Sequence, residues 1–485
     1  MRFLARDSAV YGLAAAISRL ATLLTFPIIV RQLTVSDYGV FDILQVFGGF
    51  LTVFLIFGQD SGLARYFFDH DDFETRRELI SQSFLIRVVV LAVTLPLVWL
   101  VGGKALVLLD IDPSFRPAFE ILLLQAPCLV VLNFAVVLLR VTFSRNRFIF
   151  LSIGFSFTQA ACWLVAILVY DASVRGILLS GLLAAVIYAA IGLYFIRGWL
   201  KPTLRLDFVV QMLPYSLPYG AISALRAIVP LIERALVALF LAADALGLYA
   251  AGAKITMFYA LFAFAFQSAW EPFALSIGKR SDAAATYNLV LKVFVVLACT
   301  LVLLLTVAAR PLLMVLASEK YVEAAVIVFP LLMALAIESI SWITEIGLIL
   351  QRRTSLKLLG YVLGTLASVL GIVMLAPEFG IVGVSVAVLI GAVVKAVVVT
   401  LLAGRVHDLR WDRVNFVQVL PITLIGGALI SVVAEKQSAP AAIGCFTVVT
   451  IVLFAAAYGM VLTGDERAKL AGVVRRVRGR GGNTS

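Results

Sequence analysis

Long apolar runs alternate with short polar connections from the start of the chain to about residue 460. An apolar run of about 20 residues is the length that an α-helix needs to cross the hydrocarbon core of a bilayer. The pattern predicts an all-α, polytopic membrane protein with about fourteen transmembrane helices. Their ranges are 9–31, 39–62, 81–102, 117–140, 148–170, 175–197, 214–240, 247–273, 288–309, 324–350, 356–376, 380–402, 416–434 and 441–462.

Composition agrees with this pattern. Hydrophobic residues make up 62% of the 485 residues, charged residues make up 14%, and the mean hydropathy is +1.07. These values exclude a soluble globular class. The first span is not expected to be a cleaved signal peptide, because it is long, contains Arg19 and is followed by no small-residue cleavage site.

The basic residues predict the topology. Most of the 39 Lys and Arg residues lie in the connections on one side and in the tail. Because basic connections stay on the cytoplasmic side, both termini are expected inside, in a bacterial inner membrane. The net charge of +11 therefore indicates topology and contact with anionic lipids, and no nucleic-acid partner is expected. The opposite side carries few basic residues, namely Arg31, Lys104, Arg116, Arg175, Arg310, Lys320 and Lys436.

The chain also contains an internal repeat. A set of residues in the first span and its exit recurs 208 positions later around the seventh span, and the same offset places spans one to six on spans seven to twelve. An even number of spans separates the halves, so the repeat is parallel, with a pseudo-two-fold axis along the membrane normal. The matching residues are Ser8 and Ser216, Tyr11 and Tyr219, Gly12 and Gly220, Leu33 and Leu241, and Gly39 and Gly247.

The repeat predicts the domain organisation. Residues 1–206 form an N-lobe of six helices, and residues 207–405 form a C-lobe of six helices. Residues 406–463 add two C-terminal helices, and residues 464–485 form a basic cytoplasmic tail. Residues 197–213 join the lobes, and their apolar positions indicate a short interfacial helix that tethers two moving lobes.

Charged residues inside membrane spans are costly and indicate function by default. Arg19 lies near the middle of the first span, and Arg226 lies at a matching depth in the seventh span. Arg234 and Lys254 lie further along, in spans seven and eight. Cations outnumber acids among these central residues, so we expect some of the arginines to bind an anionic substrate group such as a pyrophosphate. These four residues are the candidate substrate-binding set.

Acidic residues form a second candidate set. Glu233 lies seven residues after Arg226 on the same helical face, and Glu338 and Glu345 share one face of span ten. Together with Lys395 they could couple transport to a proton or a sodium ion, or only balance neighbouring charges. The structural alternative is a static ion pair between Glu345 and Lys395. Charges nearer the cytoplasmic ends are expected to snorkel toward water. These are Asp60, Arg87, Arg140, Glu271 and Lys292.

No catalytic, cofactor or metal site is predicted. The sequence has no glycine-rich phosphate loop ending in Lys-Ser or Lys-Thr. The two histidines, His70 and His407, lie in different connections, and the four cysteines all lie in apolar runs. Coupling, if any, is expected from a proton, a sodium ion or the membrane potential.

The opening segment carries a family resemblance. Its FLARDSAVYG entry, Arg19, Pro27 and the LTVSDYGVFDI exit resemble the polysaccharide-transport flippases of the multidrug/oligosaccharidyl-lipid/polysaccharide exporter superfamily. The resemblance implies two six-helix lobes around a cationic cavity whose arginines neutralise a pyrophosphate. The matching candidates are Arg19 and Arg226, followed by Arg234 and Lys254. Lipid II flippases have a denser set of amino-terminal arginines, which this sequence lacks.

We therefore expect a flippase, and not an enzyme, that moves undecaprenyl-pyrophosphate-linked oligosaccharide repeat units by alternating access, for O-antigen or exopolysaccharide biosynthesis. Its expected partners are this lipid-linked glycan, anionic membrane lipids, and a polysaccharide polymerase with other assembly proteins. Three alternatives remain open: a lipid II flippase, a multidrug exporter of the same superfamily, and a membrane polysaccharide polymerase.

Overall fold

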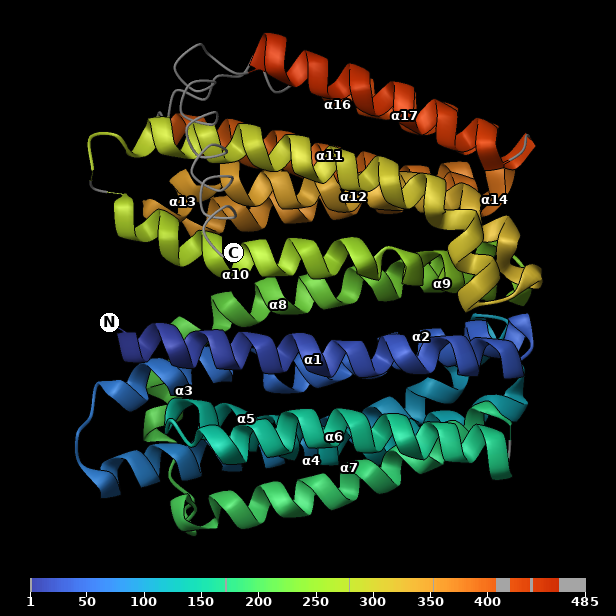
Figure 1. The fold of residues 1–485 in the computed structure, drawn as a ribbon. Helices are drawn as coiled ribbons and strands as arrows, with labels where there is room; N and C mark the ends of the chain where they lie inside the picture. Colours follow the sequence, from blue (N-terminus) through green and yellow to red (C-terminus); the bar gives the residue numbers. More distant parts are fainter. Residues whose placement is uncertain are drawn as a thin grey trace, which may run out of the picture. The chain divides into compact units, whose positions relative to one another are not determined.

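The computed structural model describes residues 2–170, 172–278, 280–351, 353–406, 419–436 and 439–461, and the predicted tail lies outside them. Within these ranges every regular element is helical and no strand occurs (Figure 1). The elements are α1 (Arg2–Gln32), α2 (Val35–Ile56), α3 (Gln59–Phe68), α4 (Phe73–Leu108), η1 (Pro113–Phe115), α5 (Arg116–Val141), α6 (Arg145–Val165), η2 (Ala166–Tyr170), α7 (Val174–Ile196), η3 (Arg197–Trp199), α8 (Asp207–Phe240), α9 (Ala243–Ile255), α10 (Met257–Ile277), α11 (Ala283–Leu316), η4 (Glu319–Ala324), α12 (Ala325–Thr344), α13 (Ile346–Leu350), α14 (Thr354–Val406), α16 (Val419–Lys436), α17 (Ala439–Ala456) and η5 (Ala457–Val461).

The helices confirm a multi-pass membrane protein. Ten helices of the described part are long and apolar enough to cross a membrane, or eleven if α9 and α10, bent by 44°, form one span. The 53 residues of α14 cover two predicted spans, because Gly380 (φ 57°, ψ −141°) breaks its helical path. Helices α1 (31 residues) and α8 (34 residues) are also long enough to cross. Each of the fourteen predicted ranges overlaps one of these helices.

The chain forms two compact units. Unit 1 contains residues 1–251, 314–321 and 372–384, and unit 2 contains residues 252–313, 322–371 and 385–485. By packing, α8 and most of α9 therefore belong with the first six predicted spans. The division into lobes at residue 206 remains a prediction, drawn from the repeat.

Two glycines that the repeat matches lie against each other within unit 1. Gly39, in the first turns of α2, approaches Gly247 of α9 so closely that a Cβ on Gly39 would lie 2.6 Å from the Gly247 backbone nitrogen. A Cβ on Gly247 would overlap the backbone oxygen of Val35. Neither position has room for a side chain, so these glycines let the starts of α2 and α9 pack backbone to backbone.

A second close contact joins α8 to the break between α2 and α3. The break lies at Phe57 (φ 40°) and Gly58 (φ 72°), where a left-handed backbone favours glycine. Gly58 and Gly62 lie against Ser216 and Gly220 of α8, and a Cβ on either glycine would overlap atoms of Ser216. Both pairs have small residues four positions apart, a spacing that allows close helix packing in membranes.

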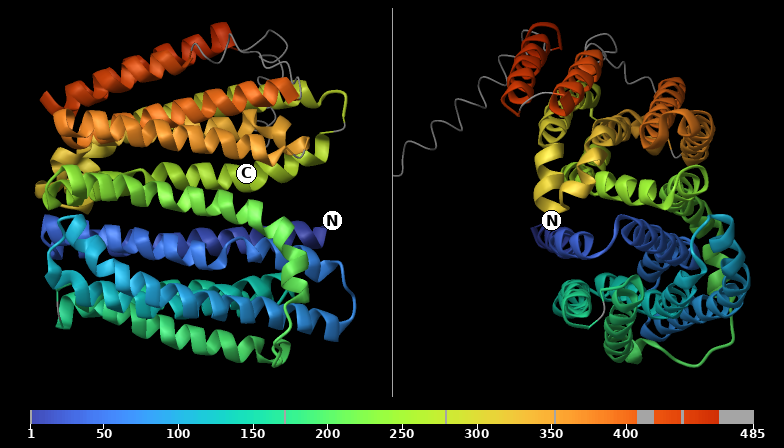
Figure 2. Two further views of the ribbon diagram at one scale, coloured as in Figure 1. Left: turned by 180° about the vertical axis from the view of Figure 1, so that it is seen from behind. Right: turned by 90° about the vertical axis from the view of Figure 1, so that its right-hand side faces the viewer.

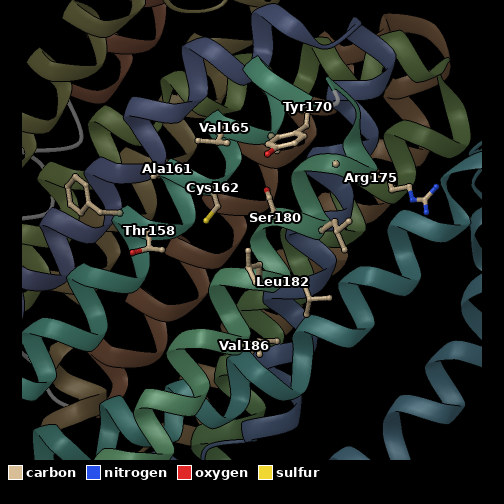
Figure 3. A pocket seen from close by; sticks show the side chains of 14 residues that line it. Thr158, Ala161, Cys162, Val165, Tyr170, Arg175, Ser180, Leu182 and Val186 are labelled. Carbon is tan, nitrogen blue, oxygen red and sulfur yellow. The ribbon is translucent and has the colours of Figure 1, made fainter.

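Unit 1 also contains a groove between α6 with η2 and α7. Its volume is about 1120 Å³, and its walls are mostly apolar. In Figure 3, Thr158, Cys162 and Val165 come from one wall, and Ser180 and Leu182 come from the other.

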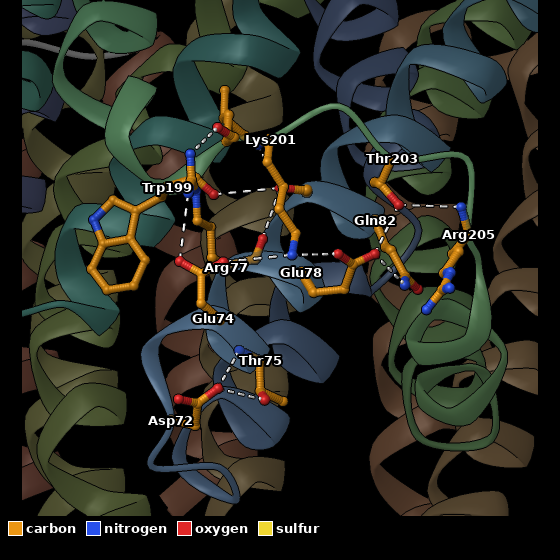
Figure 4. Close-up of polar contacts among 12 residues, drawn as sticks. Asp72, Glu74, Thr75, Arg77, Glu78, Gln82, Trp199, Lys201, Thr203 and Arg205 are labelled. Carbon is orange, nitrogen blue, oxygen red and sulfur yellow. Dashed lines mark hydrogen bonds and ion pairs between the residues drawn. The ribbon is translucent and has the colours of Figure 1, made fainter.

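Side chains of α4 bind the connection between α7 and α8 (Figure 4). The carboxylate of Glu78 accepts hydrogen bonds from Lys201 Nζ (2.7 Å), Thr203 Oγ1 (2.7 Å) and Gln82 Nε2 (3.0 Å). The Oε1 atom of Gln82 accepts from the backbone N–H of Phe208 at 2.8 Å, in the first turn of α8. The start of α8 is therefore fixed to α4, and Glu78 is the centre of the contact.

The predicted interfacial helix at 197–213 is wrong for residues 200–206, which are not helical. A 3-10 turn ends at Trp199, and helix begins only at Asp207. Pro202 lacks a backbone donor. The backbone N–H of Lys201 donates to Ser81 Oγ at 2.9 Å, and the backbone oxygen of Leu200 accepts from Arg77 Nη2 at 3.3 Å, so α4 satisfies two groups that a helix would otherwise pair. Nearby, Asp72 caps α4, and hydrogen bonds from Thr75 lower the pKa of its carboxyl.

In unit 2, the two arms of α14 fold back on each other. A Cβ on Gly364 would lie 2.6 Å from the Cβ of Lys395 and 2.8 Å from the Gly391 oxygen. The two arms thus pack as separate spans, as the sequence predicts. The helices α16 and α17, drawn in red, lie side by side in both views of Figure 2.

Candidate functional site

Helix α8 carries three of the predicted site residues, and its two arginines differ in exposure and in bonding partners. Arg226 is exposed, and it has no hydrogen-bond or ion-pair partner among the described residues. Arg234, eight residues further on, has side-chain exposure of only 11% and is paired. The structure therefore separates two residues that depth and charge alone had grouped.

Arg234 lies at the centre of a buried cluster. Its Nε–H donates to Asp42 Oδ2 of α2 at 3.0 Å, and its Nη1 lies 3.4 Å from Glu233 Oε2. The hydroxyl of Tyr249 in α9 donates to the same Glu233 oxygen at 2.9 Å. The guanidinium carbon of Arg234 also lies 5.3 Å from the centre of the Tyr249 ring. We call these four residues the α8 cluster.

The α8 cluster joins three helices of unit 1. Asp42, from α2, has side-chain exposure of only 4%, so its charge is screened from water by protein. A buried charge that loses its partner is costly, because the remaining ion stays without solvent. Arg234 is thus held by protein carboxylates, and its bond to Asp42 joins α8 to α2.

Asp42 was missed by the sequence analysis. It lies in the DYGVFDI segment that carried the family resemblance, inside the predicted second span. An acid in an apolar run was a sufficient signal, since intramembrane charges usually have a partner.

The structure says less about the surroundings of the other two predicted cations, Arg19 and Lys254. The backbone of Arg19 lies in α1, but its side chain is outside the part of the chain that the structure describes. Lys254 is half-buried in the last turn of α9. Their assignment to a substrate site stays a prediction.

In unit 2 the predicted acids are paired with lysines. Lys395 Nζ donates to Glu338 Oε1 at 2.8 Å, and it lies 4.3 Å from the centre of the Tyr361 ring. Lys357 Nζ lies 2.6 Å from Glu345 Oε1. The expected pair between Glu345 and Lys395 is therefore wrong. Glu345 and Glu338 lie two turns apart, about 10 Å along a helix, so each meets a different lysine of α14.

Arg87 also differs from expectation. It does not reach water by snorkelling, because it is only 1% exposed. Its Nη2 bonds Asp60 Oδ1 at 2.5 Å, and its guanidinium carbon lies 4.7 Å from the centre of the Phe134 ring. The bend between α2 and α3 brings Asp60 to α4, which sequence periodicity does not show.

The described residues contain no group of three His, Cys, Asp or Glu side chains that could hold a metal ion. Many of the charges within the predicted spans form protein-to-protein ion pairs. Arg226 is exposed without a partner among the described residues, as are Arg140 and Glu271 nearer the predicted cytoplasmic ends. An exposed guanidinium on a membrane helix is available to an anionic oxygen, with which it can form two parallel hydrogen bonds.

The chain was compared with known proteins. A family model described as "Polysaccharide biosynthesis protein" matches residues 4–277. No curated protein sequence matches this chain.

Several solved structures are similar in fold. The inward closed conformation of the lipid II flippase MurJ has a TM-score of 0.72 and 13% identity, covering 92% of this chain and 98% of that one. An inward-facing multidrug resistance MATE transporter of the MOP superfamily has a TM-score of 0.66 and 15% identity, covering 84% and 96%. A mutant of the Vibrio cholerae MATE transporter VcmN has a TM-score of 0.59 and 15% identity, covering 85% and 99%. At these identities the likeness shows a shared polytopic fold.

Proposed function

The chain belongs to the polysaccharide biosynthesis protein family, and on that premise we propose that it is a flippase for undecaprenyl-pyrophosphate-linked oligosaccharide repeat units. It works by alternating access in the bacterial inner membrane, with both termini in the cytoplasm, and serves O-antigen or exopolysaccharide biosynthesis. It is a transporter and not an enzyme. The sugar polymerase and other assembly proteins are its proposed partners.

The exposed Arg226 is the observation that carries this proposal. A membrane helix bears the cost of an arginine only where the charge is used. Arg226 has no protein partner in the described part of the chain, whereas Arg234 of the same helix has two. We assign Arg226 to the pyrophosphate, together with Arg19 of the first span.

Physical chemistry explains why a flippase needs such a residue. A pyrophosphate and several sugars cannot cross hydrocarbon bare, because unpaired polar and charged groups are costly there. A hydrated, positively charged chamber between two rocking lobes removes most of that cost, while the polyprenyl chain stays in lipid. The membrane potential supplies about 2.3 kcal/mol per charge per 100 mV and drives an anion outward.

The remaining predicted residues take different roles. Arg234 anchors α8 through Asp42 and Glu233, and Lys254 remains a candidate phosphate ligand. Glu338 and Lys395 balance each other, and Glu345 is balanced by Lys357. If an ion is coupled to transport, a proton or sodium ion would have to displace one of these pairs.

A complementation experiment tests the proposal. A strain without the gene should accumulate lipid-linked repeat units on the cytoplasmic face, and the wild-type gene should restore their translocation. The Arg226→Gln variant, expressed to the same level, should not restore it. Normal translocation by a variant with both Arg19 and Arg226 replaced would overturn the proposal.

A lipid II flippase is the second candidate, because the fold similarity to MurJ extends over 98% of the MurJ chain. The same strain separates the two, since loss of lipid II transport stops peptidoglycan synthesis and loss of repeat-unit transport removes surface polysaccharide. A multidrug exporter would show drug sensitivity with intact polysaccharide. A polymerase would show glycosyl transfer by the purified protein.

A further inference from the structure

The groove between α6 and α7 has features of a lipid site that the flippase proposal does not use. Its walls are mostly apolar over a volume of about 1120 Å³. Among its lining residues, Val165 is 50% exposed, Leu179 is 52% exposed and Leu183 is 58% exposed. Exposed apolar side chains on a membrane-spanning bundle are stabilised by contact with lipid chains, because water would leave them unfavourably hydrated.

The length of the groove indicates how much of the membrane it crosses. On the α6 side, its lining runs from Phe157 to Tyr170, which is about 20 Å along a helix. On the α7 side it runs from Arg175 to Val186, about 17 Å. Half of the hydrocarbon core is about 15 Å thick. The groove thus matches the acyl chains of one leaflet, and it is too short for an extended polyprenyl chain.

One end of the groove has the chemistry of a membrane interface. Helix α6 ends there in the π-helical turn η2 (Ala166–Tyr170), a wider turn that often occurs at functional sites. Tyr170 closes this turn and is 83% exposed. Tyrosine is enriched where hydrocarbon meets head groups, because its ring is apolar and its hydroxyl is polar.

A single cation stands at the same end. Arg175, in the first turn of α7, is exposed and has no bonding partner among the residues that the structure describes. In Figure 3 its guanidinium points away from Cys162 and from the other labelled residues of the groove. An arginine in this position can bind a phosphate with two hydrogen bonds, and its charge favours a lipid of net negative charge.

We propose that this groove binds an acidic phospholipid of the leaflet at the η2 end, with its acyl chains between α6 and α7 and its phosphate on Arg175. The site requires only that the chain spans a membrane, so it does not depend on the flippase proposal. It would fill the space between two helices of unit 1.

Photolabelling tests the proposal. The full-length protein is placed in phosphatidylethanolamine vesicles containing a small fraction of a phosphatidylglycerol or a phosphatidylcholine that carries a diazirine on its acyl chain. We expect phosphatidylglycerol to label peptides covering residues 157–186, and phosphatidylcholine to label them about tenfold less, the effect of one charge-assisted contact.

Two variants and two matched controls locate the contacts. Arg175→Gln should remove the preference for phosphatidylglycerol, and Leu183→Trp should block labelling by filling the groove. Lys104→Gln removes an exposed charge that the sequence places on the same side of the membrane, and Ile187→Trp adds the same bulk on α7 outside the groove lining. Both controls should label like the wild type. Thermal unfolding checks that each variant folds, and if Leu183→Trp does not, Arg175→Gln still decides.

Three results would overturn the proposal. Equal labelling by the two lipids would mean nonspecific contact with bulk membrane. An unchanged preference in Arg175→Gln would remove the head-group contact. Displacement of the label by a polyprenyl phosphate, but not by unlabelled phosphatidylglycerol, would make the groove part of the substrate path.

Discussion

The two arginines of α8 lie eight residues apart on one helix and meet opposite environments. Arg234 is bonded to Asp42 and Glu233 and is nearly buried, whereas Arg226 is exposed without a partner among the described residues. Sequence depth placed both in a substrate site. The difference shows that depth in a span does not determine whether an arginine is paired; the acids on neighbouring helices do.

Removing the partner of Arg234 should have the largest effect. Asp42→Ala leaves a buried guanidinium with one carboxylate fewer, and we expect it to cost about 3–5 kcal/mol of stability. Thermal unfolding in detergent measures the loss. The double variant Asp42→Ala with Arg234→Met removes the uncompensated charge and should be more stable than the sum of the single effects predicts. Strict additivity would show that the two side chains are not coupled.

The contact between Gly39 and Gly247 should have the next largest effect on stability. Gly39→Ala places a methyl group against the backbone of Gly247 and should destabilise the protein by about 1–3 kcal/mol, the usual cost of overpacking. Gly49→Ala is the matched control in the same helix, since a Cβ there meets no atom within 4 Å. It should be neutral or slightly stabilising, because alanine favours a helix. Equal melting temperatures for the two variants would contradict the close packing of α2 and α9.

The contact between α4 and the connection that precedes α8 should have a smaller effect on stability. Glu78→Gln weakens the bonds to Lys201 and Thr203, and the partly exposed position limits the expected loss to about 1 kcal/mol. Limited proteolysis of the connection 200–206 offers a direct readout, because those residues are released first. Unchanged cleavage would show that α4 does not hold this connection.

The smallest effect on stability is expected at Arg226. Arg226→Gln removes no bond to the described residues, so the free energy of unfolding should change by no more than about 0.5 kcal/mol, as for a typical surface substitution. Thermal unfolding in detergent checks this. A large destabilisation would show that Arg226 supports the fold, and it would remove the contrast with Arg234.

The sequence predicted most of the long helices but not the partners of their charges. Each predicted span overlaps a described helix, although the break at Phe57 and Gly58 within the range 39–62 was not predicted. The 208-residue offset matched Gly39 with Gly247, which lie against each other in unit 1. Which charged side chains pair depends on how each helix is rotated about its axis. The hydrophobic pattern does not reveal this rotation in a membrane, because all sides of a helix can be hydrophobic there. Asp42 with Arg234 and Lys357 with Glu345 were therefore found only in the structure.

The connection between α7 and α8 failed for a related reason. Its apolar positions suggested an amphipathic helix, but Arg77 and Ser81 of α4, more than a hundred residues earlier, bond to the backbone of Leu200 and Lys201 in place of helical partners. Local pattern cannot anticipate a distant partner. Arg226 is a case in which no distant partner changes the sequence prediction. Its assignment to a substrate was inferred from its depth in the span, and no described residue pairs with its guanidinium.

Translocation by Arg226→Gln is the most direct test of the central claim. The gene is deleted from a strain, and the wild-type, Arg226→Gln or Arg226→Lys protein is produced in it at equal levels. Inverted membrane vesicles from each strain are then supplied with lipid-linked repeat units. The account predicts that Arg226→Gln folds normally but loses translocation, and that Arg226→Lys keeps part of it because the charge remains. Wild-type translocation by Arg226→Gln would contradict it.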